Sequence, residues 1–496
     1  MLAIPKNLDI ELLIKEVKKY SQPKDLDLLR LIYDFADTAH AGQTRKSGEP
    51  YITHPLATAY ILALMRIDPH IIAAALLHDV PEDTKVTIAD IEKNFGKDIA
   101  GMVRGITKLG ALKYRGVERY IENLRKMFVA MAEDVRVMII KFADRVHNLL
   151  TLDAHQPNKR YRIALESLEI YAPIANRLAM GEFKGMLEDL SFPYIFPKEY
   201  EKVKTIREQT LANVTQTLEK TRNKINHELK KSGINVYSLD SRAKQLYSLY
   251  QKLLRKNWEI EKVFDIIALR VIVKDVSDCY AALGIVHQLW HPLKGRIKDY
   301  IAQPKPNGYQ SLHTTVFGEE GKIIEFQIRT QEMHDEAEYG VAAHWHYDEH
   351  GVRLPNKNIA WAQELANLQK EILTSLSDLE EMKIDFFHNH IFVFTPKGDV
   401  IDLPEDATPV DFAYHIHTDI GNHCNGAKVN DQLVSLDTPL RSGDVVEIMI
   451  SKDRKGPSPD WMKTVKTHAA KTHIKNSLNK SKLEWLKSIL PGKNKN

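Results

Sequence analysis

The stretch AAALLHDVPEDT, residues 73–84, places four ionisable side chains directly against an apolar run. These are His78, Asp79, Glu82 and Asp83. A carboxylate loses hydration when it is buried, so it needs a compensating partner. The His-Asp pair therefore predicts either a hydrogen-bonded core pair or a metal site. Pro81 lacks an amide hydrogen and disfavours helix at the residue before it. We expect the helix to stop near Val80, with the acidic pair on the turn beyond.

The sequence around this stretch predicts helices throughout the first 200 or so residues. Apolar residues recur at spacings of three and four in DLLRLIYDFADTAH, PLATAYILALM and VRVMIIKFADRVHNLLTL. His54, in EPYITHP, and Asp144, in KFADRVHN, are two more buried-looking candidates. With His78 and Asp79 they supply two imidazoles and two carboxylates. This set suits a divalent ion such as Mn, Fe, Mg or Zn.

The periodicity changes after a long polar helical stretch that begins near residue 198. VFDIIALRVIV is almost continuously apolar, which predicts a strand in the middle of a sheet. KIIEFQIRT alternates, so Glu325, Gln327 and Arg329 share one face and the apolar residues form the other. Asp265 lies at the start of the first strand, where a carboxylate can reach Mg²⁺. By periodicity alone, an ordinary solvent-facing strand explains Glu325 equally well.

The C-terminal part indicates a small β-rich module followed by a basic tail. HIFVFTPKGDVIDLP and SGDVVEIMI predict short strands, which places the module at residues 388–451. A linker helix is expected at 351–387. Residues 452–496 hold twelve Lys or Arg against three Asp or Glu, so the rest of the chain is net negative. Such a tail could contact RNA or another acidic surface, or it could be a solvated linker.

The whole-chain composition limits the class of protein. A chain of 496 residues predicts three or four domains. Cys279 and Cys424 cannot build a disulfide framework or a thiolate cluster, so a reducing, cytoplasmic location is expected. The sequence contains neither a signal-like segment nor an apolar run long enough for a membrane span. A glycine-rich loop ending in Gly-Lys-Ser or Gly-Lys-Thr is also absent, so phosphates must be held by other means.

The N-terminal motifs resemble the HD phosphohydrolase superfamily and, beyond it, the hydrolase domain of the RelA/SpoT homologue family. AHAGQTRKSGEPYITHP, ALLHDVPEDT, GITKL, ENLRKM, KFADRVHNL and ESLEIYAPIANRLAM follow one another in that family's order. The resemblance implies hydrolysis of guanosine tetra- or pentaphosphate, (p)ppGpp. It assigns a Mn²⁺ site to His54, His78, Asp79 and Asp144, and proton handling to Glu82 and Asp83. It also assigns substrate binding to Arg45, Lys46 and Asn148, while His40 and His147 are interpreted as structural.

The middle of the chain resembles the synthetase domain of the same family, which has a nucleotidyltransferase-like fold. The motifs are SRAKQLYSLYQK, VFDIIALRVIV, GRIKDYIAQPKPNGYQSLHTTV and EFQIRTQEMHDEAEYGVAAHW. The implied reaction transfers pyrophosphate from ATP to the 3′-hydroxyl of GDP or GTP. Asp265 and Glu325 would hold Mg²⁺, and Glu325 would also take the hydroxyl proton. The implied ATP- and GDP-binding residues are Arg242, Lys244, Arg270, Arg296, Lys298, Lys305, Asn307, Tyr309, His313 and Gln327.

The resemblance also organises the whole chain. Arg296-Ile297-Lys298-Asp299 matches the form found in bifunctional members of the family, which favours two activities in one chain. Residues 388–451 resemble the family's TGS domain, which contacts tRNA or protein partners, and a metal role for His415, His417 and His423 is not favoured. The expected fold class is multidomain, with an all-α HD-type hydrolase domain, an α+β nucleotidyltransferase-like synthetase domain and a small β-grasp-like TGS domain. The expected boundaries are 1–195, 196–350, 351–387, 388–451 and 452–496.

Two other functions stay open from the sequence. One is a hydrolase with a weak or silent synthetase. The other is a regulator that binds RNA or the ribosome through the TGS module and the basic tail. Under the bifunctional interpretation, occupancy at one site is expected to disfavour the competent form of the other, with the helices between about 150 and 220 as the connecting element.

Overall fold

The computed structural model describes residues 4–110, 127–340 and 390–478. The positions inside these ranges that it does not describe are 6, 128, 129, 132, 306, 398, 399, 442, 452, 453, 455 and 468. The chain divides into two compact units, residues 1–368 and 369–496, and each is described by itself. The linker helix predicted at 351–387 lies outside the described residues, as does the end of the basic tail.

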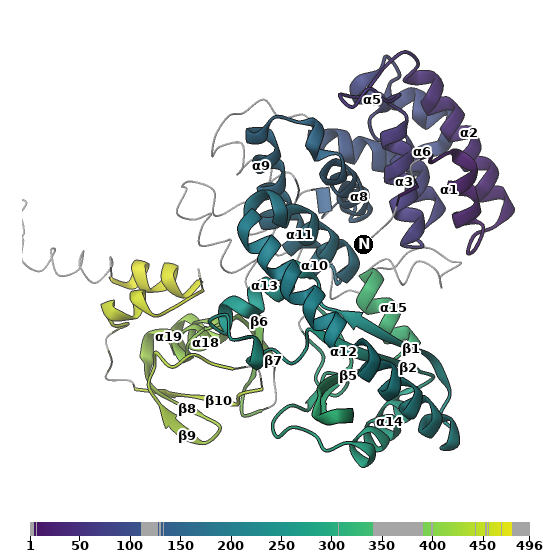
Figure 1. The fold of residues 1–496 in the computed structure, drawn as a ribbon. Coiled ribbons are helices and arrows are strands. Elements are labelled where there is room, and N and C mark those ends of the chain that lie inside the picture. Colours follow the sequence, from purple (N-terminus) through teal and green to yellow (C-terminus); the bar gives the residue numbers. More distant parts are fainter. Residues whose placement is uncertain are drawn as a thin grey trace, which may run out of the picture. The chain divides into compact units, whose positions relative to one another are not determined.

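The first part of the larger unit is helical, as predicted (Figure 1). Its α-helices are α1 (Ile10–Val17), α2 (Pro23–Ala39), α3 (Thr53–Leu64), α4 (Pro69–Leu76), α5 (Val80–Asp83), α6 (Ile88–Gly110), α8 (Arg136–Leu150), α9 (Pro157–Glu166), α10 (Ala172–Arg177) and α11 (Gly181–Ile195). Helices α3 and α4 are apolar on nearly every side and are buried along most of their length. They pack against each other and against α8. This apolar centre carries the His-Asp segment.

The helix before His78 ends earlier than the sequence suggested. Helix α4 stops at Leu76, and residues 77–79 form a turn. Pro81 then occupies the first turn of the short helix α5, where its missing amide hydrogen costs nothing. The expectation that the helix would run to Val80 was therefore wrong. His78 and Asp79 lie on the turn between two helices, and Glu82 and Asp83 lie on α5.

The second part of the larger unit is a five-stranded mixed sheet with helices. Its elements are α12 (Pro197–Lys231), β1 (Val236–Ala243), α13 (Leu246–Arg255), β2 (Ile267–Val273), α14 (Val276–Leu289), β3 (Lys298–Asp299), β4 (Leu312–Phe317), β5 (Ile323–Thr330) and α15 (Gln331–Tyr339). The strand order is β1-β2-β5-β4-β3. β2 and β5 are parallel, and the other pairs are antiparallel. The predicted central strand is β2, between β1 and β5.

The two faces of this sheet differ in chemistry. One face is apolar and packs with α12, α13 and α14 in a single core. Ile324, Phe326 and Ile328 of β5 belong to it, which confirms the alternation predicted there. The opposite face carries Glu325 and Gln327. It is this polar face that the candidate residues occupy.

The smaller unit is β-rich. Strands β6 (His390–Phe394) and β7 (Val400–Pro404) form the predicted hairpin, while β8 (Cys424–Val429), β9 (Gln432–Val434) and β10 (Val446–Ile450) form a second sheet. Two short helices, α18 (Pro409–Ile416) and α19 (Thr418–His423), lie between them in sequence. The start of the predicted tail packs here, because Trp461, Val465 and Ile474 share a core with α18.

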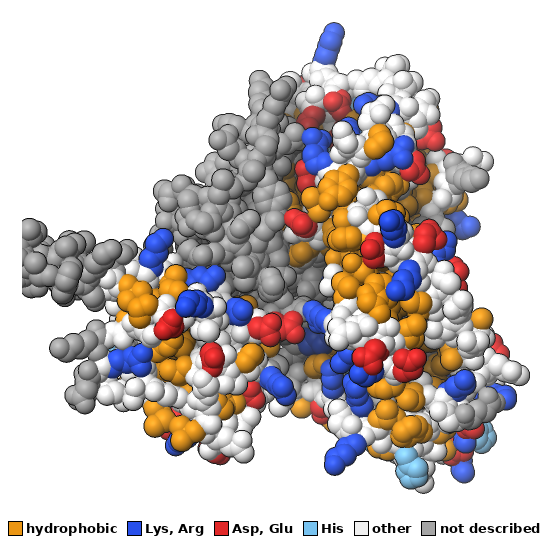
Figure 2. Space-filling model, turned by 60° about the vertical axis from the view of Figure 1, so that its left-hand side comes forward, with side chains coloured by type: hydrophobic (Ala, Val, Ile, Leu, Met, Phe, Trp, Pro, Cys, Tyr) orange, Lys and Arg blue, Asp and Glu red, His pale blue; other side chains and the backbone are white. Residues whose placement is uncertain are grey.

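The described surface does not indicate a particular class of partner. Within the described part of the chain, no helix is both long and apolar enough to cross a membrane. On the face drawn in Figure 2, acidic and basic side chains are mixed among apolar ones. We therefore turn to the buried polar groups.

Candidate active sites

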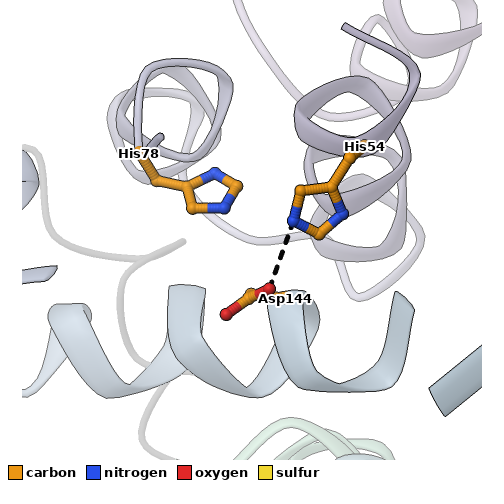
Figure 3. Close-up of side chains that lie close together, drawn as sticks. All are labelled: His54, His78 and Asp144. Atoms are coloured by element: carbon orange, nitrogen blue, oxygen red, sulfur yellow. Dashed lines mark ion pairs between the residues drawn. The ribbon is translucent and has the colours of Figure 1, made fainter. Parts of the chain in front are cut away.

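Three buried side chains from different helical segments meet in the first part of the chain. His54 comes from α3, His78 from the turn after α4 and Asp144 from α8, and they point toward one another (Figure 3). One ligand atom of each lies within 4.8 Å of the others. Asp79 contacts both imidazoles, with its oxygens 3.5 Å from His54 Nε2 and 3.1 Å from His78 Nε2. Three of the four predicted ligands therefore gather around one point, and Asp79 lies beside both imidazoles.

His78 has the tautomer that a metal ligand needs. Its Nδ1 lies 2.7 Å from the carbonyl oxygen of Ala75. A carbonyl can only accept, so Nδ1 carries a proton and Nε2 is the nitrogen left to bind a metal. That Nε2 is buried and makes no hydrogen bond of acceptable geometry. An unpartnered buried nitrogen is costly in a core, and a cation beside Asp144 would satisfy it.

His54 is held in the same tautomer by a longer chain of contacts. Arg45 Nη1 lies 3.0 Å from His147 Nδ1, which lies 2.7 Å from His54 Nδ1. A guanidinium can only donate, so His147 Nδ1 accepts and His54 Nδ1 must supply the other hydrogen. Burial, together with His54 and Arg45, lowers the pKa of His147 to about 2, which keeps it neutral. The Nε2 of His54 then faces Asp79 and Asp144, and it lies 3.2 Å from Asp144 Oδ1.

Asp144 is ionised although it is buried. Burial opposes its ionisation, but Lys141, whose Nζ lies 2.6 Å from Oδ2, outweighs this and holds the pKa of Asp144 well below its usual range. Asn148 donates to Oδ1 at 2.5 Å, and Arg45 donates to Asn148 Oδ1 at 3.4 Å. The predicted substrate residues Arg45 and Asn148 are thus joined to the ligand group. Lys46 is exposed and lies near Lys159. Burial and the charge of Lys46 together lower the pKa of Lys159.

Glu82 and Asp83 are distinguished by their hydrogen bonds. The Tyr51 hydroxyl lies 2.6 Å from Asp83 Oδ2 and 3.0 Å from Asp79 Oδ2. Within the described residues, no hydrogen bond or ion pair joins Glu82 to another side chain. Desolvation raises the pKa of Glu82, and Lys141 only partly offsets this. Of the predicted pair, Asp83 is held in place by Tyr51, whereas Glu82 has a raised pKa and makes none of these contacts.

The donor set of this first site suits a divalent cation. Two imidazoles and two carboxylates match the ligands that Mn²⁺, Fe²⁺ or Zn²⁺ prefer. The second partners of the imidazoles, Ala75 and His147, fix which nitrogen can bind. A second such group of three or more is not found elsewhere in the parts of the chain that the structure describes.

The second site lies on the polar face of the sheet and is built by strand register. Lys298, His313, Gln327, Arg270 and Asp240 are paired one after another across all five strands. The adjacent row contains Glu325, Ala268 and Arg242. Residues paired in this way share a face. Candidates from five separated segments therefore form one surface.

Asp265 precedes β2 and is paired with two lysines. Its Oδ2 lies 2.7 Å from Lys244 Nζ and 2.5 Å from Lys252 Nζ. Burial opposes ionisation of this carboxyl, but the two ammonium groups outweigh it and lower the pKa of Asp265 to about 2. Oδ1 is buried without a partner. One oxygen is therefore still available to a cation.

A hydrogen-bonded chain joins Glu325 to Tyr309. His313 Nδ1 lies 3.1 Å from Glu325 Oε1, and the Tyr309 hydroxyl lies 2.9 Å from His313 Nε2. Burial lowers the pKa of His313, so it is neutral, donates to the carboxylate and accepts from Tyr309. Gln327 also donates to Glu325 Oε1, at 3.2 Å. The chain orients a carboxylate and an aromatic ring together.

Cationic groups surround this chain. Lys305 Nζ lies 4.8 Å from the centre of the Tyr309 ring. Desolvation and the nearby ammonium groups of Lys298 and Lys244 lower the pKa of Lys305 to about 8. Arg296 lies over the ring of Phe264. Such a cluster can stabilise negative charge on phosphoryl oxygens.

Three family models match the chain: an HD domain over residues 33–181, a region found in RelA / SpoT proteins over 241–352 and a TGS domain over 391–450. The bifunctional (p)ppGpp synthase/hydrolase SpoT of Escherichia coli K12 is 45% identical over 466 residues, which cover 93% of this chain and 66% of that relative. The chain belongs to the RelA/SpoT family. The predicted family and fold class are therefore confirmed.

Other relatives of this RelA/SpoT chain carry names for each activity. A guanosine-3′,5′-bis(diphosphate) 3′-pyrophosphohydrolase of Aquifex aeolicus is 45% identical over 464 residues, 93% of this chain and 66% of that relative. A GTP pyrophosphokinase of Myxococcus xanthus is 43% identical over 474 residues, 94% of this chain and 62% of that relative. The chain spans less than two thirds of the length of these curated relatives. Membership of the family implies a divalent metal in the HD domain.

Some predicted residues make contacts away from the two centres. Asn307 donates to the Asn176 carbonyl, on α10, at 3.3 Å. Arg242 and Arg270 both contact Glu338 of α15. Arg329 was expected on a functional or solvated face, yet it is fully buried. Its pairing with Glu338 explains this, because a buried guanidinium needs a carboxylate.

Sequence reasoning missed several side chains that shape the sites: His147, Tyr51, Lys141, Glu182 and Glu338. His147 was interpreted as structural, and its neighbours 102 and 93 residues away could not be inferred from spacing. Lys141 had a detectable signal, because it lies one helical turn before Asp144. Glu338 offered none, since its partners come from three different strands.

Proposed function

We propose that this chain both degrades and makes (p)ppGpp and so controls the stringent response. The HD region would hydrolyse (p)ppGpp to GDP or GTP plus pyrophosphate. The synthetase region would transfer the β,γ-pyrophosphate of ATP to the 3′-hydroxyl of GDP or GTP. The observation that carries the proposal is that each of the two matched regions gathers its own polar side chains around one point, with an unpartnered ligand atom at each.

For hydrolysis, His54, His78, Asp79 and Asp144 would hold Mn²⁺. A divalent cation bound there supplies Lewis acidity toward a phosphoryl oxygen and lowers the pKa of water. Glu82 accepts the proton of the attacking water, because desolvation raises its pKa toward the working range. Tyr51 holds Asp83 beside it.

Substrate binding in the hydrolase would fall to the rim of the site. Arg45 and Lys46 bind phosphate oxygens, and Asn148 contacts the nucleoside. Arg45 and Asn148 are already hydrogen-bonded to each other, at 3.4 Å. A guanidinium offers several donors in one plane, so Arg45 can contact His147 and a phosphate together.

For synthesis, Asp265 and Glu325 would hold Mg²⁺, which neutralises charge on the transferred group when bound. Glu325 accepts the proton of the 3′-hydroxyl, and that oxygen forms a bond to the β-phosphorus while AMP leaves. Tyr309 stacks on guanine, and Arg242 and Arg270 stack on adenine through their planar faces. The cations that would cradle the phosphates are Lys244, Arg296, Lys298 and Lys305, with His313 and Gln327 orienting the carboxylate and Asn307 beside Tyr309.

The remaining assignments rest on the sequence. The TGS module and the basic residues after it would contact tRNA, the ribosome or a protein partner. A cytoplasmic location and the domain boundaries at 195, 350, 387 and 451 stay predictions.

Two assays test the proposal. The protein is incubated with ATP and GDP plus Mg²⁺, and separately with ppGpp plus Mn²⁺, and nucleotides are resolved by ion exchange. We expect ppGpp and AMP in the first reaction and GDP plus pyrophosphate in the second. Hydrolysis without transfer would indicate a hydrolase-dominant enzyme. This outcome is tested separately because Asp265, the proposed Mg²⁺ ligand, is paired with two lysines. Neither reaction together with RNA binding would favour the regulator.

A further inference from the structure

The polar face of the sheet carries a cluster of three arginines around one carboxylate. Glu338 Oε1 accepts from Arg242 Nη1 at 3.1 Å, from Arg270 Nη1 at 2.9 Å and from Arg329 Nη2 at 2.8 Å. Arg329 is 0% exposed and Glu338 6% exposed. Because all three guanidinium groups donate to the same oxygen, any two of the donating nitrogens lie within two hydrogen-bond lengths of each other.

This geometry leaves the arginine faces available. A hydrogen bond to a carboxylate uses the N–H edge of a guanidinium, whereas stacking on a base uses its planar face. Arg242 and Arg270 are partly exposed, so a base can reach them. Arg329 also lies 5.9 Å from the centre of the Tyr309 ring. Glu338 therefore sits between the side chains proposed for adenine and the one proposed for guanine.

The cluster has excess positive charge. His334 Nδ1 lies 2.7 Å from Arg329 Nη2 and must accept, so this imidazole is neutral, and burial lowers its pKa to about 4. Three guanidinium groups thus face one ionised carboxylate. Arg329 Nε and Nη1 and Arg270 Nε are buried without partners.

A second carboxyl reaches this cluster from the other domain. Glu182, on α11, interacts with Glu338 by a side-chain hydrogen bond and is also close to Arg242 and Arg270. Two carboxylates side by side repel, so one of them holds a proton. Burial and Glu338 raise the pKa of Glu182 to about 7, whereas the arginines keep that of Glu338 near 2. Glu182 is thus the donor and Glu338 the acceptor.

The junction that carries Glu182 is a close backbone contact. A Cβ on Gly181 would lie 2.6 Å from the Ala337 carbonyl oxygen, and a Cβ on Gly340 would lie 2.3 Å from that of Leu178. Gly340 also has φ +60°, which disfavours other residues. The start of α11 and the end of α15 therefore touch without intervening side chains. A shift of α11 would move Glu182 relative to Glu338.

We propose that Glu338 is the positioning residue for the nucleotide-facing arginines and that Glu182 ties it to the hydrolase domain, so that the ATP side of the synthetase responds to α11. This inference rests on the proposed synthetase function. It gives the predicted coupling between the two domains a specific contact. When Glu182 loses its proton or moves away, the charge that holds the arginine cluster together changes.

Binding of a non-reactive ATP analogue tests the positioning role. The full chain is titrated with α,β-methylene-ATP and Mg²⁺ by calorimetry, and KM for ATP is measured separately from kcat. Glu338→Gln should weaken analogue binding and raise KM about tenfold, the loss expected for charge-assisted hydrogen bonds, with a smaller change in kcat. Glu332→Gln, exposed on the same helix, is the matched control and should behave like the parent. Hydrolysis of ppGpp monitors folding.

The role of Glu182 is tested by pH. The charged and titratable groups around it are Glu338 and Tyr339 on α15, Arg242 on β1 and Arg270 on β2. Below pH 7 Glu182 is protonated and donates; above it a second charge appears beside Glu338. We expect analogue affinity to fall between pH 6 and 8 in the parent. Glu182→Gln keeps a donor and cannot ionise, so its affinity should fall less over this range than that of Glu332→Gln. The fall that remains comes from Lys305, whose pKa desolvation lowers to about 8.

The outcomes separate the two proposals. If the parent does not bind the analogue, the proposed synthetase function is wrong. If the parent binds it and Glu338→Gln binds equally well, the positioning role is wrong. If Glu182→Gln keeps the parent's pH dependence, Glu182 does not tie the cluster to the hydrolase domain.

Discussion

The two candidate sites of this chain treat their carboxylates in opposite ways. In the helical domain, Asp79 and Asp144 face the imidazoles of His54 and His78, and Lys141 pairs with Asp144. On the sheet, Asp265 is held by two lysines and Glu338 by three arginines. The first site is negative at its centre and attracts a cation. The second is positive and attracts phosphates.

Under the proposed function, this difference would let one chain carry two phosphate reactions without a glycine-rich loop. Where water attacks, a cation-binding centre supplies the Lewis acid. Where a hydroxyl attacks, side-chain cations supply most of the charge stabilisation. The following substitutions test that division, from the largest expected effect to the smallest.

Asp144→Asn should abolish the cation-binding centre. Hydrolysis should fall by roughly a thousandfold, because losing bound cation removes several kcal/mol of transition-state stabilisation. Calorimetric Mn²⁺ titration and ppGpp hydrolysis measure the loss, while transfer by the same protein should be unchanged. Asp37→Asn removes the same charge from the exposed side of α2 and serves as the control. Unchanged Mn²⁺ binding in Asp144→Asn would contradict the assignment.

Asp265→Asn should impair transfer and leave hydrolysis intact. Transfer from ATP to GDP should fall about a hundredfold, since a carboxylate that orients two lysines and a cation is lost. Hydrolysis should persist, which makes it the internal control for folding. The carboxyl has a lowered pKa near 2, so its contribution to stability is present above the ordinary pKa of an aspartate and is lost as pH falls through about 2. If transfer survived the substitution, Asp265 would have no part in it.

His147→Leu should weaken Mn²⁺ binding about ten- to a hundredfold, the usual cost of losing the second partner of a ligand histidine. The leucine cannot accept from His54 Nδ1, so the tautomer of His54 is no longer fixed. His147→Asn places an amide oxygen near the lost nitrogen and should rescue much of the affinity. Calorimetry gives the affinities, and equal loss in both variants would indicate packing instead of tautomer control.

Tyr51→Phe should lower hydrolysis about tenfold through the loss of one hydrogen bond to a charged group. The hydroxyl has one hydrogen to donate, and Asp83 is its nearer acceptor, so the change should appear in kcat more than in Mn²⁺ affinity. Transfer should be unaffected. A variant with parental kcat would show that Asp83 is positioned by other contacts.

The smallest effect concerns the acidic limb of hydrolysis. Glu82 must be ionised to accept a proton, so hydrolysis should decline as pH falls through its raised pKa. Asp83 contributes to that raised pKa, because its charge disfavours a second one nearby. Asp83→Asn should therefore move the limb to lower pH, apart from any change in maximal rate. A limb that stays in place would exclude Glu82 as the titrating base.

Much of the fold was predictable because it depends on local periodicity. The three-and-four spacing around residues 26–39 and 135–152 indicated helices, and the alternation in β5 placed Phe326 in the core. Chemistry confined to a short stretch was also accessible. The His-Asp pair in an apolar run predicted either a hydrogen-bonded core pair or a metal site.

What failed or was missed depends on contacts between distant segments. The helix before His78 ends at Leu76, and the turn that follows brings His78 together with His54 and Asp144. Arg329 is buried because α15 brings Glu338 over the sheet. Neither packing arrangement has a signature in spacing.

The sequence by itself determined which residue types are present and which face of each helix or strand they occupy, since side-chain periodicity follows from backbone geometry. Only the tertiary structure decided their chemical states. The free nitrogen of His54 depends on His147 and Arg45, and the proton on Glu182 depends on Glu338. Protonation and tautomer are set by partners within a few ångströms, and folding alone brings those partners together.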